Sequence, residues 1–234
     1  RLDIAFIILV LACSGLAIMW LGHYTDIDLL LADAAFDRTL RIFPLRHAWL
    51  PDTFNHGILK ALFTGLGAGI IVLVLLDLAR PMRGIAASIR LRLRIVGLSA
   101  GLVPLVIGML KQASDAHCPW DLARYGGVEP YVRLFDALPS GASAGHCLPA
   151  GHASTSLWLV ALAVFWLPGN PGKAAGVAAA GLAAGLAMGW MQQLRGAHFL
   201  THTLWSAWIA VLVVLVTTVV IDAAARRYTP QTTS

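Results

Sequence analysis

Six long apolar stretches constrain the fold of this chain more than any other feature. Each runs for 16 to 22 residues, close to the roughly 20 that a helix needs to cross the hydrocarbon core of a bilayer. Hydrophobic residues make up 58% of the chain and charged residues 12%, which excludes a soluble or a disordered domain. The sequence therefore predicts an all-α polytopic membrane protein, a six-transmembrane-helix bundle forming a single domain over residues 1–234. The predicted spans are 4–21, 57–76, 95–110, 152–167, 174–190 and 200–221.

The segments between the spans differ in character. Residues 26–56 carry apolar side chains at mixed three- and four-residue spacings, which favours an amphipathic helix on the membrane surface or across the end of the bundle. Residues 111–149 form a long polar segment rich in Gly, Pro and Asp, and residues 168–172 fit a tight helical hairpin.

The distribution of positive charge predicts the orientation. Five arginines lie between Arg80 and Arg94, tight against two span ends, so we expect that side to be cytoplasmic. The net charge of +5 then describes membrane loops and gives no reason to expect a nucleic-acid partner. All eight histidines fall on or near the opposite face, although the longer loops there account for part of this bias: His23, His47, His56, His117, His146, His152, His198 and His202.

Three clusters of chemically active residues stand at span ends on the histidine-rich face. The first runs from Lys111 to Pro119, the second is Pro149-Ala150-Gly151-His152, and the third is Arg195-Gly196-Ala197-His198 with His202. Taken singly, each cluster has an ordinary explanation. A lone lysine at a span end is usually an interface anchor, a Pro-x-Gly sequence usually marks a helix start, and an H-x3-H pair is structural or binds a metal. An antiparallel bundle can bring all three together at one depth, where ionisable groups indicate function.

Together these clusters resemble the type 2 phosphatidic acid phosphatase (PAP2) superfamily, whose motifs are K-x6-R-P, P-S-G-H and S-R-x5-H-x3-D. Lys111, His152 and His198 match the motif residues in order and topology. The chain departs from the motifs at several positions, among which Cys118 and Gln192 replace arginines, Ala150 replaces serine and His202 replaces aspartate. A second alignment, with Arg195 as the third-motif arginine and His202 as its histidine, is off by one residue.

The resemblance implies a role for each site residue. His198 is the expected nucleophile, His152 the general acid, and His202 the partner that fixes the tautomer of His198. No metal or other cofactor is required. The expected phosphate ligands are Lys111, Arg195, the Gly151 amide, and Arg124 or Arg133 in place of the arginine lost at Cys118.

Cys118 and Cys147 share the polar segment, and each stands beside a motif. In an oxidising periplasm they either form a disulfide or remain free thiols, and the sequence leaves both open. Trp120 and Tyr125 fit either an interfacial aromatic belt or a pocket for a lipid headgroup.

The expected function is hydrolysis of a lipid phosphate or diphosphate through a phosphohistidine. The resemblance places the protein in the bacterial inner membrane with its site facing the periplasm. It allows undecaprenyl diphosphate, phosphatidylglycerol phosphate, phosphatidate and lipid A phosphates as substrates. Three alternatives stay open: lipid-to-lipid phosphotransfer, a non-catalytic relative, and a haem- or metal-binding membrane protein. The sequence does not indicate an oligomeric state.

Overall fold

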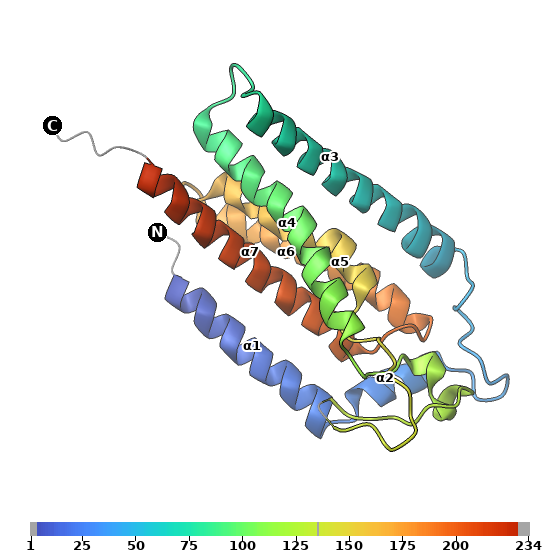
Figure 1. Ribbon diagram of the computed structural model, residues 1–234. Helices are drawn as coiled ribbons and strands as arrows, with labels where there is room; N and C mark the ends of the chain where they lie inside the picture. The colour runs from blue at the N-terminus through green and yellow to red at the C-terminus, as the bar shows by residue number, and fades with distance from the viewer. Residues whose placement is uncertain (1–3, 135, 229–234) are drawn as a thin grey trace.

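The computed structural model describes residues 4–134 and 136–228, and within them the chain is all-α (Figure 1). A π-helix, Leu50–Leu59, runs directly into α3, and a 3-10 helix, Trp158–Trp166, continues α5. Two single 3-10 turns, Pro119–Asp121 and Ala123–Tyr125, lie in the polar segment. The seven α-helices of the described residues are α1 (Ile4–Tyr24), α2 (Ile27–Ala35), α3 (Lys60–Ala79), α4 (Ala87–Gln112), α5 (Gly151–Leu157), α6 (Pro171–Leu194) and α7 (Leu200–Tyr228).

Five of these helical segments are long and apolar enough to cross a membrane. They are 21 to 30 residues long: Ile4–Tyr24, Leu50–Ala79, Ala87–Gln112, Pro171–Leu194 and Leu200–Arg227. Large apolar side chains such as Leu16, Val72 and Leu76 are exposed along them. Water would not tolerate apolar surfaces of this extent, and lipid covers them without cost. The protein is therefore a polytopic membrane protein.

The fourth expected span differs from the other five. It is a shorter apolar helix, Gly151–Trp166, which begins as α5 and changes to 3-10 geometry at Trp158. The 3-10 form rises about 2.0 Å per residue against about 1.5 Å in an α-helix, so these residues still extend roughly 28 Å.

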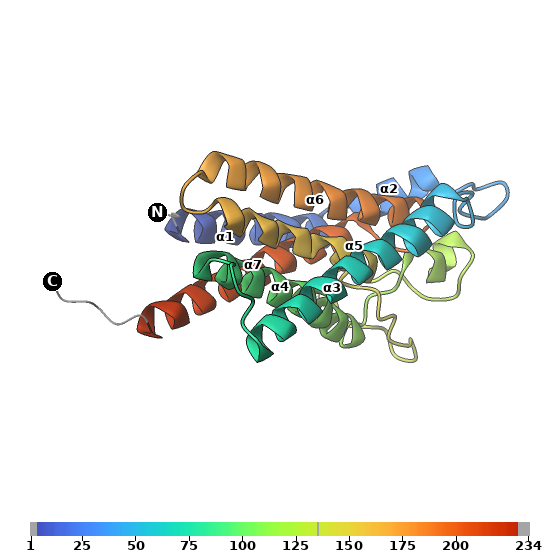
Figure 2. The same cartoon turned by 90° about the horizontal axis from the view of Figure 1, so that it is seen from above.

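This short helix lies at the centre of the bundle. Figure 2 shows α5 between α6 and the α4–α7 layer, and α5 also contacts α3. Leu157, Trp158 and Ala161 are buried against Val103 and Ile107 of α4, and α7 completes the same core cluster. The helix that carries the second motif is thus held by neighbours on several sides.

A cap covers the end of the bundle where the polar segment lies. Only Ile27–Ala35 of the expected amphipathic segment forms a regular α-helix there, and the next predicted span begins at Leu50 rather than at Gly57. The α2 helix contacts α6 and α7. Phe43, Leu122 and Phe199 bury their side chains in a small second core beneath it. Figure 1 shows the start of α1 and the end of α7 at the opposite end of the bundle.

Candidate active site

Four imidazole rings from four parts of the chain form a row under the cap. The ring centroids of His56 and His152 are 4.2 Å apart, those of His152 and His198 5.8 Å, and those of His198 and His202 5.9 Å. The π-helix supplies His56, the start of α5 supplies His152, the α6–α7 turn supplies His198, and α7 supplies His202. The second and third motifs, far apart in sequence, therefore meet in space.

His198 is held in one orientation by the turn that carries it. Gly196 adopts φ +74°, and a Cβ at that position would overlap the ring of Phe43, so the turn requires glycine. The His198 side chain is 2% exposed, and its Nδ1 lies 3.4 Å from Sγ of Cys147. That sulfur belongs to a disulfide and carries no proton, so a hydrogen bond between the two atoms has the ring nitrogen as its donor. The lone pair of Nε2 is then left free for attack.

The electrostatic surroundings keep the His198 ring neutral. His198 lies outside the membrane-spanning helices, between α6 and α7. Burial is the main cause that lowers its pKa well below the ordinary 6.5, and His202, His152 and Lys111 lower it further. A neutral imidazole is the form that can act as a nucleophile.

Positive charge gathers beside the first two imidazoles of the row. Nζ of Lys111 lies 4.0 Å from the position that a Cβ on Gly151 would occupy, so the ammonium group stands over the first residue of α5. The first backbone amides of a helix have no intrahelical partner and can bind an anion. Lys60, Lys111 and Arg195 all act electrostatically on the His152 ring.

The comparison with known families agrees with this geometry. The family model of the PAP2 superfamily matches residues 92–226, which is more than half of the chain. The chain belongs to the PAP2 superfamily. No curated protein and no solved structure matches it.

The guanidinium group of Arg195, which was expected to bind phosphate, already has three partners within the protein. Its Nε donates to the carbonyl of Arg46 (2.8 Å), its Nη1 donates to Oε1 of Gln192 (2.9 Å), and its Nη2 pairs with Asp52 at 2.7 Å. Gln192, which stands where the PAP2 motif has arginine, is buried and donates to the carbonyl of Pro51. These two residues thus fasten the cap segment to α6 while keeping the guanidinium near the imidazoles.

The structure does not bring Arg124 or Arg133 to the imidazole row. Arg124 donates to the carboxylate of Asp33 from Nε at 2.8 Å, and this bond is the main cause that lowers the pKa of Asp33 to about 2. Arg133 donates to the carbonyl of Thr25 and to the carboxylate of Asp26. Acidic partners in the cap thus hold both guanidinium groups that were expected to replace the first-motif arginine.

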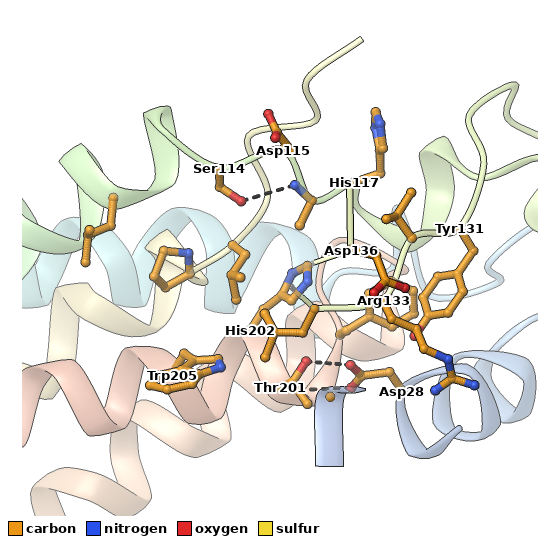
Figure 3. Close-up of a pocket in the computed structure, with 18 of the residues that line it drawn as sticks. Asp28, Ser114, Asp115, His117, Tyr131, Arg133, Asp136, Thr201, His202 and Trp205 are labelled. Carbon is orange, nitrogen blue, oxygen red and sulfur yellow. Dashed lines mark hydrogen bonds between the residues drawn. The ribbon is translucent and has the colours of Figure 1, made fainter. Parts of the chain in front are cut away.

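His202 also differs from its expected role. No hydrogen bond joins it to His198 within the described residues, and its buried Nδ1 has no partner. The disulfide sulfur of Cys147 contacts His198 where His202 was expected to do so. His202 instead faces a cavity on the other side of the row (Figure 3).

Two residues in the site were missed by sequence reasoning. His56 stacks against His152, and Lys60, four positions later, adds a positive charge to the same region. The four-residue spacing of His56 and Lys60 was the available signal, since it places two side chains on one helix face. Their helix was expected to begin only at Gly57.

Cys118 and Cys147 form a disulfide that joins the first motif to the residues before the second. The sulfur of Cys147 is fully buried, and it lies within ligand distance of His198 together with Cys118. These three residues have the donor atoms of a metal site, but sulfurs bonded to each other are not thiolate ligands. The oxidised pair therefore favours a structural staple over a metal centre.

Proposed function

We propose that this protein is a membrane lipid phosphatase that acts through a phosphohistidine at His198. The observation that carries the proposal is the placement of a buried, neutral imidazole beside His152, with the Lys111 ammonium over the start of α5. A nucleophile, a proton donor and an anion site thus converge within one row of side chains.

The reaction follows from these positions. Nε2 of His198 attacks phosphorus, the N–P bond forms and the bond from phosphorus to the lipid oxygen breaks. The leaving alkoxide takes a proton from the protonated His152 ring, and the neutral ring later removes a proton from the water that cleaves the N–P bond. Lys111, the Gly151 amide and Arg195 offset the charge on the phosphoryl oxygens. No step in this scheme needs a metal or another cofactor.

We place the site at the periplasmic leaflet of a bacterial inner membrane. The helix Gly151–Trp166 extends roughly 28 Å, close to the roughly 30 Å of a hydrocarbon core, so we count it as the sixth span of a single domain. The arginines from Arg80 to Arg94 lie at the end opposite the imidazole row and support a cytoplasmic location for that end.

The test of this function is phosphate release from purified protein in detergent. The panel contains phosphatidate, phosphatidylglycerol phosphate, undecaprenyl diphosphate and lipid A, compared with a water-soluble phosphomonoester. We expect release from at least one lipid, with little from the soluble ester. Equal rates on soluble and lipid esters would contradict a lipid substrate, and loss of activity with a chelator would contradict the metal-free scheme.

Replacing Lys111 with alanine should weaken catalysis strongly without unfolding the protein. Its ammonium group is the charge nearest the start of α5, and a charged hydrogen bond to a phosphoryl oxygen contributes about 2 to 3 kcal/mol, or roughly 30- to 150-fold in kcat/KM. Lys173 at the other end of the bundle provides the matched control, and Lys173→Ala should leave kcat/KM unchanged. A Lys111→Ala variant with wild-type kcat/KM would remove this residue from the site.

The protonation state of His198 can be measured directly by nitrogen NMR on histidine-labelled protein. An ordinary histidine is about nine-tenths protonated at about pH 5.5. Since burial lowers the pKa of His198 well below 6.5, its ring should stay neutral there and carry its proton on Nδ1. The His198→Ala spectrum assigns the signal. A His198 ring that gains its second proton near pH 6.5, or that carries its proton on Nε2, would contradict this description of the nucleophile.

A further inference from the structure

A cavity opens beside His202, at one end of the imidazole row. Its volume is about 650 Å³, within the range of small-molecule sites. Residues 113–117, Asp28 in the first turn of α2 and the first turns of α7 contribute to its wall, and Figure 3 shows His202 among the lining residues with Trp205 further along the same helix. Leu110, Phe199, Trp208 and Ile209 give part of the lining an apolar character.

Two buried polar atoms that α7 contributes to this wall have no hydrogen-bond partner. Nδ1 of His202 and Nε1 of Trp205 are both inaccessible and unbonded, and the His202 side chain is 5% exposed. Trp208, three residues on, differs, because its Nε1 donates to the carbonyl of Leu11 at 2.8 Å. A buried indole N–H without an acceptor costs free energy, so these two atoms indicate a ligand with a small polar group.

The charges around the cavity exclude an anionic headgroup. Three carboxylates line it: Asp28, Asp115 and Asp136. Among the described lining residues, Arg133 alone carries a lysine or arginine charge. It is already paired with Asp26 and with the carbonyl of Thr25. Asp28 accepts from both the amide and the hydroxyl of Thr201, which holds this wall in place (Figure 3). Carboxylates therefore outnumber cations around this cavity.

We propose that this cavity binds the hydroxyl end of a long-chain alcohol. The hydroxyl oxygen accepts from Nε1 of Trp205 and the hydroxyl hydrogen is donated to Nδ1 of His202, while the chain lies along Leu110 and Ile209. A hydroxyl group is the smallest group that serves an indole donor and an imidazole acceptor at once, and it carries no charge for the carboxylates to repel. The inference rests on the proposed function, which makes such an alcohol either the product of hydrolysis or an acceptor for the phosphoryl group.

The experiment is photolabelling of the detergent-purified protein with a diazirine-bearing long-chain alcohol. We expect saturable labelling of peptides from residues 113–117 and 201–209. Trp205→Phe keeps an aromatic ring but removes the N–H. It should raise the alcohol concentration needed for half-maximal labelling about threefold to tenfold. The matched control Trp190→Phe, on the exposed face of α6, and Lys111→Ala should both label as the wild type does. Unchanged labelling of Trp205→Phe, or labels spread over the lipid-facing helices, would overturn the proposal.

Two further measurements distinguish an alcohol that is the reaction product from one that is the phosphoryl acceptor. Inhibition of phosphate release by the unlabelled alcohol identifies a product site, and a new phosphorylated alcohol identifies an acceptor site; either result supports the proposal. If the wild type releases phosphate, an alcohol that binds but neither inhibits the release nor becomes phosphorylated would overturn the proposal. If the wild type releases no phosphate while Trp205→Phe still weakens labelling, the proposed function fails and the cavity assignment stands.

Discussion

Replacing His198 with alanine should lower phosphate release by about three orders of magnitude or more, because it removes the atom that forms the bond to phosphorus. His198→Gln should be equally inactive, since an amide keeps the polarity but is not a nucleophile. Initial rates on the best lipid phosphate of the panel measure both. No neighbouring imidazole is expected to compensate, because the ring centroids of His152 and His202 lie 5.8 and 5.9 Å from that of His198.

The controls must show that the loss of activity comes from the missing nucleophile and not from misfolding. His146 is exposed, lies in the polar segment 111–149 and has φ +47°, a conformation that asparagine tolerates, so His146→Asn should keep wild-type rates. Thermal unfolding in detergent should show that His198→Ala remains folded. A folded His198→Ala protein with more than about a tenth of the wild-type rate would exclude His198 as the nucleophile.

Removing the disulfide should cause the largest loss of stability of any change in the cap. Cys118 and Cys147 are 29 positions apart, and closing a loop of this size contributes about 3 to 4 kcal/mol by the chain-entropy estimate. The double variant with alanine at both positions should therefore unfold at a clearly lower temperature or denaturant concentration. Cys13→Ala, on the exposed face of α1, is the matched control and should unfold like the wild type.

The same double variant should also act more slowly. The sulfur of Cys147 contacts Nδ1 of His198, so its loss frees the ring to rotate or to change tautomer. We expect kcat to fall more than KM rises, and the Nδ1–H signal of His198 to weaken in the nitrogen spectrum. A double variant with wild-type stability and kcat would contradict both roles of the disulfide.

Much of the fold could be predicted because lipid imposes a simple length and polarity rule on spanning helices. The rule failed where tertiary packing decides helix geometry. Residues 158–166 adopt 3-10 geometry among buried neighbours, and Leu50 rather than Gly57 begins the second long apolar segment, which starts as a π-helix. Neither change has a signal in hydropathy, because the residues involved remain apolar or stand next to apolar runs.

The site was predictable to the extent that its residues lie in motifs. Lys111, His152 and His198, to which the resemblance to the PAP2 superfamily pointed, lie close together, and the two cysteines whose pairing the sequence left open form a disulfide. His56 was missed because only the folding of the cap places it against His152. Arg124 was wrongly expected in the site because proximity in a loop does not reveal its partner, and that partner, Asp33, lies 91 positions away.

The most direct test of the proposed mechanism is to trap the phosphorylated intermediate. Protein mixed with a lipid phosphate carrying labelled phosphorus, quenched in alkali within milliseconds to seconds and digested, should yield one labelled peptide that contains His198. The label should be lost in acid, as expected for a phosphoramidate, and should be absent from His198→Ala. A protein that turns over the same lipid with no covalent label, or with the label on another residue, would contradict a phosphohistidine at His198.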